Sequence, residues 1–115
     1  MSDLDQLKLR IRQFADERDW QQYHSPKNLA MALIVEAAEL VEHFQWLTEA
    51  QSQTLAPEKL AQVSDELADI QIYLIRIADQ LKVDLLEAVD KKIEKNAVKY
   101  PADKVRGSAK KYNEL

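Results

Sequence analysis

Apolar residues recur at intervals of three and four along most of the chain, which is the period of amphipathic helices. The pattern predicts four helices, over residues 4–19, 26–47, 57–82 and 84–98. Ser25 and Pro26 suit the cap and first turn of the second helix, and Asp84 with Glu87 resembles a capping box for the fourth. Residues 48–57 show no clear period and are expected to form a loop with room for a short helical turn. The pattern therefore predicts an all-α fold.

The third predicted helix is apolar on nearly all of its faces. Ile72 and Ile75 lie off its main stripe, towards what would be solvent in a monomer. The stripe expected to face the core is formed by Leu60, Val63, Leu67, Ile70, Leu74, Ile77 and Leu81. A helix that is apolar all round is usually buried all round. We therefore expect a homo-oligomer with this helix near the interface.

Composition supports helices and narrows the chemistry. The 115 residues include one glycine, three prolines and no cysteine, which favours helices and excludes a disulfide framework, a thiolate zinc site and a cysteine nucleophile. The length suits a single domain over residues 1–115. No apolar run approaches the roughly 20 residues that span a bilayer, and the N-terminus is polar. We expect a cytoplasmic protein with no membrane partner.

Charge is unevenly distributed along the chain. Residues 1–89 carry 8 basic and 16 acidic side chains, whereas residues 90–115 carry 8 basic and 4 acidic. The basic end is a weak sign of an anionic ligand, or it only solubilises the protein. A nucleic-acid partner is not expected, because the acidic body would repel a phosphate backbone. Residues 98–115 contain a proline and the only glycine and are expected to form an irregular basic tail.

Two pairs of acidic residues lie beside the apolar stripes of the second and third helices. In the second helix, Glu36 and Glu39 lie about 50° and 110° to one side of the stripe. In the third, Glu66 and Asp69 lie about 70° and 130° from theirs, on the same side. The stripe of the second helix consists of Leu29, Leu33, Ala37, Leu40 and Phe44. Each pair is spaced i, i+3 and shares a face, whereas Glu42 falls on the opposite face and should be solvated.

If the two helices pack antiparallel, these four carboxylates would line one cleft. Four anions so close repel one another unless cations lie between them. Oxygen ligands without histidine or cysteine favour Mg²⁺, with Mn²⁺ also possible. Alternatively, the acids are boundary residues that are half exposed or paired with lysines. A di-iron bundle would pair glutamate with histidine at i, i+3, and neither pair contains histidine.

Aromatic and polar residues accompany the acids. Trp20 ends the first predicted helix, Trp46 ends the second, and Tyr73 lies one turn beyond Asp69. The fourth helix carries Asn96 and a cluster of three lysines, Lys91, Lys92 and Lys95. Tryptophans beside a carboxylate-bound metal would suit stacking on a base, and lysines would suit a polyphosphate. Packing in a core or interface remains the alternative for each tryptophan, and His24 is interpreted as a polar residue near a helix start.

The acid spacing also resembles that of a known family. ExxE at Glu36 and Glu39, followed after 26 residues by ExxD at Glu66 and Asp69, is similar to the all-α nucleoside triphosphate pyrophosphohydrolases of the MazG-like superfamily. The resemblance to the dCTP pyrophosphatase branch covers about residues 7–115 and is carried by FADERDWQQYHSPKNLAMALIVEAAELVEHFQW, ELADIQIYLIRIADQLKVDLLEAV and KNAVKYPADKVRGSAKKYNEL. The first motif reads VExxE where many members have EExxE. Ile11 stands where eukaryotic dCTP enzymes have histidine, which bears on base preference.

The resemblance implies Mg²⁺-dependent hydrolysis of a (deoxy)nucleoside triphosphate, dCTP or a related dNTP, to the monophosphate and pyrophosphate. The positions that match the family's metal ligands are Glu36, Glu39, Glu66 and Asp69, of which Glu39 or Glu66 would activate water. The positions that match the family's base and sugar pocket are Trp20, Trp46 and Tyr73. Those that match its other nucleotide contacts are Lys92 and Asn96. The family also implies a four-helix bundle-like protomer in a dimer or dimer of dimers, with sites completed across subunits. A non-catalytic helical interaction module is the alternative function.

Overall fold

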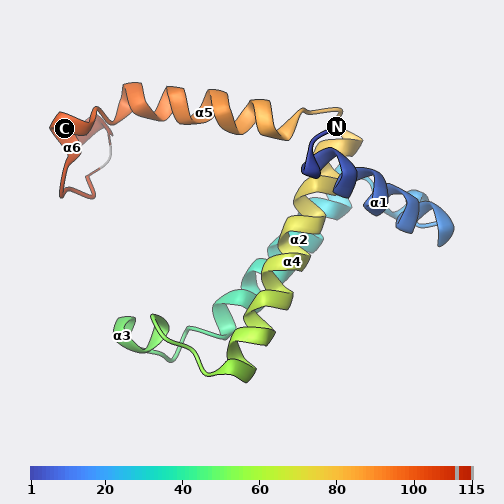
Figure 1. The fold of residues 1–115 in the computed structure, drawn as a ribbon, viewed down its shortest axis with the longest axis horizontal. Coiled ribbons are helices and arrows are strands. Elements are labelled where there is room, and N and C mark those ends of the chain that lie inside the picture. The colour runs from blue at the N-terminus through green and yellow to red at the C-terminus, as the bar shows by residue number, and fades with distance from the viewer. Residues whose placement is uncertain (111, 115) are drawn as a thin grey trace. The chain divides into compact units, whose positions relative to one another are not determined.

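The protein is described here by a computed structural model that covers residues 1–110 and 112–114 (Figure 1). These residues form helices and connecting loops without any strand, so the all-α prediction is confirmed. Contacts divide the chain into two compact units, Met1–Lys82 and Val83–Leu115, and each is described by itself. The first unit contains α1 (Asp3–Glu17), η1 (Gln21–Tyr23), α2 (Pro26–Glu42), α3 (Glu49–Ser52) and α4 (Pro57–Gln80). The second contains α5 (Leu85–Lys99), α6 (Ala102–Val105) and η2 (Tyr112–Glu114).

Helix α1 ends in a turn that reverses the chain. Asp19 adopts a left-handed conformation with φ of 53°, and its N–H donates to the Asp16 carbonyl at 3.1 Å. The N–H of Trp20 donates to the Ala15 carbonyl at 2.9 Å, which completes a Schellman motif. The turn brings the Trp20 indole edge-on to the ring of Phe14, with ring centroids 5.7 Å apart. The C-terminal motif of α1 therefore fixes where Trp20 lies.

Helix α2 starts where the sequence predicts and ends earlier. Ser25 caps it by accepting from the Asn28 N–H at 3.1 Å. The expected extension to residue 47 is wrong, because the helix ends at Glu42 and residues 43–46 form turns. The Phe44 N–H bonds to the Val41 carbonyl at 2.9 Å, an i→i+3 bond that tightens and ends the helix. A Thr48–Gln51 capping box then begins α3, the short helical turn allowed for in the loop.

Helices α2 and α4 lie side by side and antiparallel (Figure 1). At one end, Lys59 Nζ lies 3.3 Å from His43 Nδ1. At the other end, the Gln80 side chain donates to the His24 carbonyl at 2.8 Å. The predicted stripe of α2, from Leu29 to Phe44, is buried or half-buried throughout. The antiparallel pair is the scaffold on which the candidate site is built.

The expected core face of α4 is partly wrong. Val63 is buried, but the leucines of the expected stripe are between 37% and 55% exposed; they are Leu60, Leu67, Leu74 and Leu81. Residues seven apart differ by about 20° on a helix, so these leucines form one row, and this row is largely uncovered in the single chain. Ile75, expected to face solvent, is only 3% exposed because α1 packs on that side of α4. Ile72 remains exposed, as expected for a single copy.

In the second unit, α5 begins at the expected cap. Asp84 accepts from the Glu87 N–H at 3.1 Å, but the Glu87 carboxylate pairs with Lys91 at 2.6 Å, so the expected capping box is only half formed. The prediction of an irregular tail is wrong for two segments, which form α6 and η2. Pro101 precedes α6, where its fixed φ suits a helix start. Among the described residues, none of the helices has the length and apolarity to cross a membrane.

Candidate metal centre

Three of the four predicted acids converge between α2 and α4. Glu36 and Glu39 come from α2 and Glu66 from α4, and one oxygen of each lies within 4.8 Å of the others. All three side chains are half-buried. Asp69, one turn further along α4 from Glu66, is exposed and lies outside this group. Glu42 is exposed, as expected.

The electrostatics of this acid cluster, Glu36, Glu39 and Glu66, are unfavourable without a cation. The Oε2 atoms of Glu36 and Glu66 are buried and have no hydrogen-bond partner. The neighbouring Glu66 carboxylate, burial, and the charges of Glu39 and Asp69 together raise the pKa of Glu36 to about 7. The ion pairs among the described residues do not include these acids.

The acid cluster fits a hard divalent cation. Three carboxylates supply six oxygens, and two of these oxygens are buried without a donor. Mg²⁺ and Mn²⁺ prefer such oxygen ligands, and a bound cation would offset the repulsion that otherwise holds a proton on Glu36. The arrangement could therefore hold a divalent metal ion.

Tyr73 lies beside the acid cluster. It is half-buried on α4, one turn beyond Asp69. Burial, followed by the charges of Glu36 and Asp69, raises the pKa of the Tyr73 hydroxyl. The phenol therefore stays protonated near the acids and can act as a hydrogen-bond donor there.

The two tryptophans lie at opposite ends of α2. Trp20 precedes the helix, is 41% exposed, and contacts Phe14 and His24, with ring centroids 5.7 Å and 6.0 Å away. Trp46 follows the helix in a turn and is 87% exposed. Because α2 has 17 residues, about 25 Å of helix separates its ends. A single copy of the chain therefore does not bring both indoles to one ligand.

Lys92 and Asn96 belong to the second unit. Both are exposed on α5, one turn apart. The Lys92 side chain lines a hollow of about 360 Å³ on this helix together with its neighbours Asp84, Glu87, Ala88, Lys91 and Lys95. Their role stays a prediction.

Sequence reasoning missed a second group of buried charges, at the C-terminal end of α4. Arg76 is 2% exposed and contacts Asp79 one turn away. A signal was available, because an arginine between Ile75 and Ile77 on an apolar helix face is rarely buried without an acidic partner.

The fold and the acid cluster define an all-α protein in which three carboxylates that could hold a metal ion lie between two antiparallel helices. The family model described as the MazG-like family matches residues 31–115. The chain belongs to this family, as the acid spacing indicated.

Similarity to known proteins extends over nearly the whole chain. The chain is 42% identical to human dCTP pyrophosphatase 1 and 43% identical to the mouse protein of that name, over 114 residues. Each alignment covers 97% of this chain and 67% of the relative. The crystal structure of a pyrophosphatase from Archaeoglobus fulgidus superimposes with a TM-score of 0.76 at 39% identity, covering 88% of this chain and 94% of the other. The resemblance to the dCTP pyrophosphatase branch is thus confirmed.

Proposed function

We propose that this protein is a Mg²⁺-dependent pyrophosphohydrolase that converts a deoxynucleoside triphosphate, dCTP or a related dNTP, to the monophosphate and pyrophosphate. The observation that carries the proposal is the acid cluster, in which three carboxylates converge and two of their buried oxygens lack a donor. Hydrolysis of nucleoside triphosphates is supported by relatives from rat, human, mouse and cattle that are named dCTP pyrophosphatase 1. Hydrolysis of unwanted deoxynucleoside triphosphates would keep them out of the precursor pool for DNA synthesis.

The acid cluster would hold the metal, with Asp69 completing the ligand set from the exposed side. When bound, Mg²⁺ neutralises triphosphate charge and lowers the pKa of a coordinated water. Glu39 and Glu66 are the candidates to orient the attacking water and accept its proton, because each stands within the cluster, where the water would lie. Tyr73 would donate a hydrogen bond to the substrate beside the cluster.

Recognition of the nucleotide falls to the aromatic and basic residues. An exposed indole such as that of Trp46 presents a flat apolar face on which a base can stack. Trp20 would supply the second aromatic wall. Lys92 would contact phosphate and Asn96 the nucleotide, as their positions in the family imply.

The positions of the tryptophans favour a homo-oligomer, a dimer or a dimer of dimers of four-helix bundle-like protomers. Because Trp20 and Trp46 lie at opposite ends of α2, a nucleotide at the acid cluster would meet both only if one comes from a second copy. The exposed leucine row of α4, from Leu60 to Leu81, offers an apolar surface of the kind that subunit interfaces cover.

Pyrophosphate release tests the function directly. Purified protein is mixed with Mg²⁺ and each canonical or modified NTP or dNTP, and pyrophosphate is converted to phosphate and measured. We expect release from dCTP or a related dNTP, with loss of activity on chelation and recovery with Mg²⁺. Absence of pyrophosphate with every nucleotide would reject the proposal in favour of a non-catalytic helical interaction module.

A further inference from the structure

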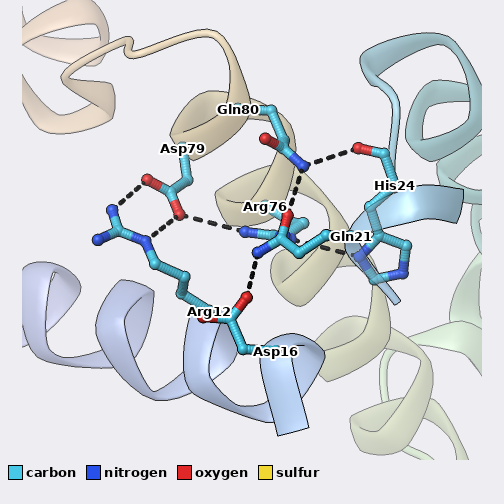
Figure 2. A network of polar contacts seen from close by, with 7 residues as sticks. All are labelled: Arg12, Asp16, Gln21, His24, Arg76, Asp79 and Gln80. Carbon is cyan, nitrogen blue, oxygen red and sulfur yellow. Dashed lines mark hydrogen bonds and ion pairs between the residues drawn. The ribbon is translucent and has the colours of Figure 1, made fainter. Parts of the chain in front are cut away.

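A buried guanidinium organises a polar network near the C-terminal end of α4 (Figure 2). Arg76 is 2% exposed and donates in three directions. Its Nη1 contacts Asp79 at 3.3 Å, its Nε donates to His24 Nδ1 at 3.3 Å, and its Nη2 donates to the Gln21 side-chain oxygen. One side chain thus joins α4 to the connection between α1 and α2.

The connection between α1 and α2 is also held by bonds to Gln80 and Asp16. Gln80 donates to the His24 carbonyl at 2.8 Å and to the Gln21 side-chain oxygen at 3.3 Å. The Gln21 amide donates to Asp16, at the end of α1. Figure 2 shows these side chains converging on Gln21 from both helices. Residues 21–24 are therefore fixed through side chains as well as backbone.

Trp20 is fixed from both of its sides by this arrangement. It directly precedes Gln21, and its indole lies 6.0 Å from the His24 ring, which accepts from Arg76. The Schellman turn at the end of α1 sets its backbone, but the indole is still 41% exposed. A half-exposed aromatic side chain needs a rigid support if it is to present one face to a ligand.

We propose that Arg76 is a positioning residue, which holds the Gln21–His24 connection so that the Trp20 indole is presented to the nucleotide base. The inference rests on the proposed function for its consequence in catalysis, but not for its structural part. Among the described residues, the side-chain bonds of Arg76 are to Asp79, His24 and Gln21, and none is to the acid cluster. Loss of Arg76 is expected to weaken nucleotide binding and to leave the hydrolytic step nearly unchanged.

The charge state of His24 agrees with this role. Burial, followed by the charge of Arg76, lowers the pKa of His24, so the ring stays neutral and its Nδ1 lone pair is free to accept. Without Arg76 the His24 pKa should rise towards its ordinary value near 6.5.

The test compares Arg76→Gln with Arg12→Gln. Arg12 belongs to the same network, but within the described part of the chain its side chain bonds to Asp79 alone, with Nη2 at 2.6 Å and Nε at 3.0 Å, and not to residues 21–24. We expect Arg76→Gln to raise KM for the nucleotide about tenfold with kcat within about twofold, and Arg12→Gln to leave KM unchanged. Gln21→Ala keeps the Arg76–Asp79 pair and should raise KM to a smaller degree, which preserves the test if Arg76→Gln folds poorly.

Two measurements are independent of catalysis. In a Trp46→Phe background, Trp20 fluorescence should shift to the red and become more accessible to acrylamide with Arg76→Gln, but not with Arg12→Gln. Titration of His24 by NMR should show the rise in pKa. A wild-type KM and unchanged Trp20 emission in Arg76→Gln, or equal effects of the two arginine variants, would overturn the inference. If no nucleotide is hydrolysed, the proposed function fails while the fluorescence and NMR results still decide the role of Arg76.

Discussion

Helix α4 carries two groups of buried charge, which differ in whether the charges are paired. Near its middle, Glu66 joins two glutamates of α2, and two carboxylate oxygens have no partner. Ten residues further on, about 15 Å along the helix, Arg76 and Asp79 are paired with each other and with neighbours on α1 and in the α1–α2 connection. Removing one partner of a buried pair is costly because the other charge is left unpaired, whereas buried charges of one sign make a candidate ligand site. The two groups on α4 therefore differ in that one has its charges paired within the fold and the other is a candidate ligand site.

The largest effect is expected at the paired end. Asp79→Ala would leave Arg76 buried without its acid, and breaking such a pair costs about 3–5 kcal/mol of unfolding free energy. Urea denaturation with the metal-free protein measures this. The matched control is Asp65→Ala, an exposed aspartate on the same helix, which should change stability by no more than about 0.5 kcal/mol. Equal losses in the two variants would mean that the network does not stabilise the fold.

At the unpaired end the effect should be on activity instead. Glu39→Gln is expected to lower kcat/KM at least about 100-fold, or about 2.7 kcal/mol of transition-state stabilisation, because it removes a metal ligand and candidate base. The metal-free variant should unfold no more easily than wild type, since a negative charge leaves the cluster. Glu42→Gln, one turn away and exposed, is the control and should keep full activity. Full activity in Glu39→Gln would remove Glu39 from the site.

Metal binding should stabilise the fold through the acid cluster and not through the Arg76 network, and this effect should be smaller. At a free Mg²⁺ concentration about ten times its Kd, the unfolding free energy should rise by about 1.4 kcal/mol. The increment should persist in Asp79→Ala and disappear in Glu39→Gln. Chemical denaturation with and without Mg²⁺ measures it, and a loss of the increment in both variants would show that the two ends are coupled.

The two ends should also differ in the pH dependence of metal-free stability, and their contributions should have opposite signs. The pKa of Glu36 is raised from 4.5 to about 7, so between these values the folded protein holds a proton that the unfolded chain has lost. This contribution to stability is present at low pH and is lost as pH rises to 7. The pKa of Asp79 is lowered, first by its hydrogen bonds from Arg12, so its contribution is lost only as pH falls below 3.8. Glu36→Gln should flatten the first slope, and an unchanged slope would contradict the assignment.

Much of the candidate site could be predicted because it depends on local geometry. The i, i+3 spacing of Glu36 and Glu39 places both on one face of any regular helix, and Glu66 follows the same rule on α4. Antiparallel packing of two consecutive long helices then brings the acids together. The prediction that Glu42 faces solvent on the opposite side of the helix followed from the same angles, and its exposure confirms it.

The parts that were wrong depend on packing that no short stretch of sequence records. Which side of α4 is covered depends on where α1 packs, and this decides the burial of Ile75 and the exposure of Leu67. The Arg76 network joins residues 52 and 55 positions apart, so spacing along the chain does not reveal it. The early end of α2 depends on a change to i→i+3 bonds ahead of the Thr48 capping box.

The unpartnered oxygens of Glu36 and Glu66 have a consequence for protein engineering. Selection for heat resistance alone, in the absence of metal, should favour substitutions that neutralise these two glutamates, because each relieves repulsion at a buried position. Such variants would be recovered early and would be inactive. A thermostable form of this protein is therefore best sought by screening with Mg²⁺ and nucleotide present, or by holding α2 and α4 unchanged around the acids while the surface elsewhere is varied.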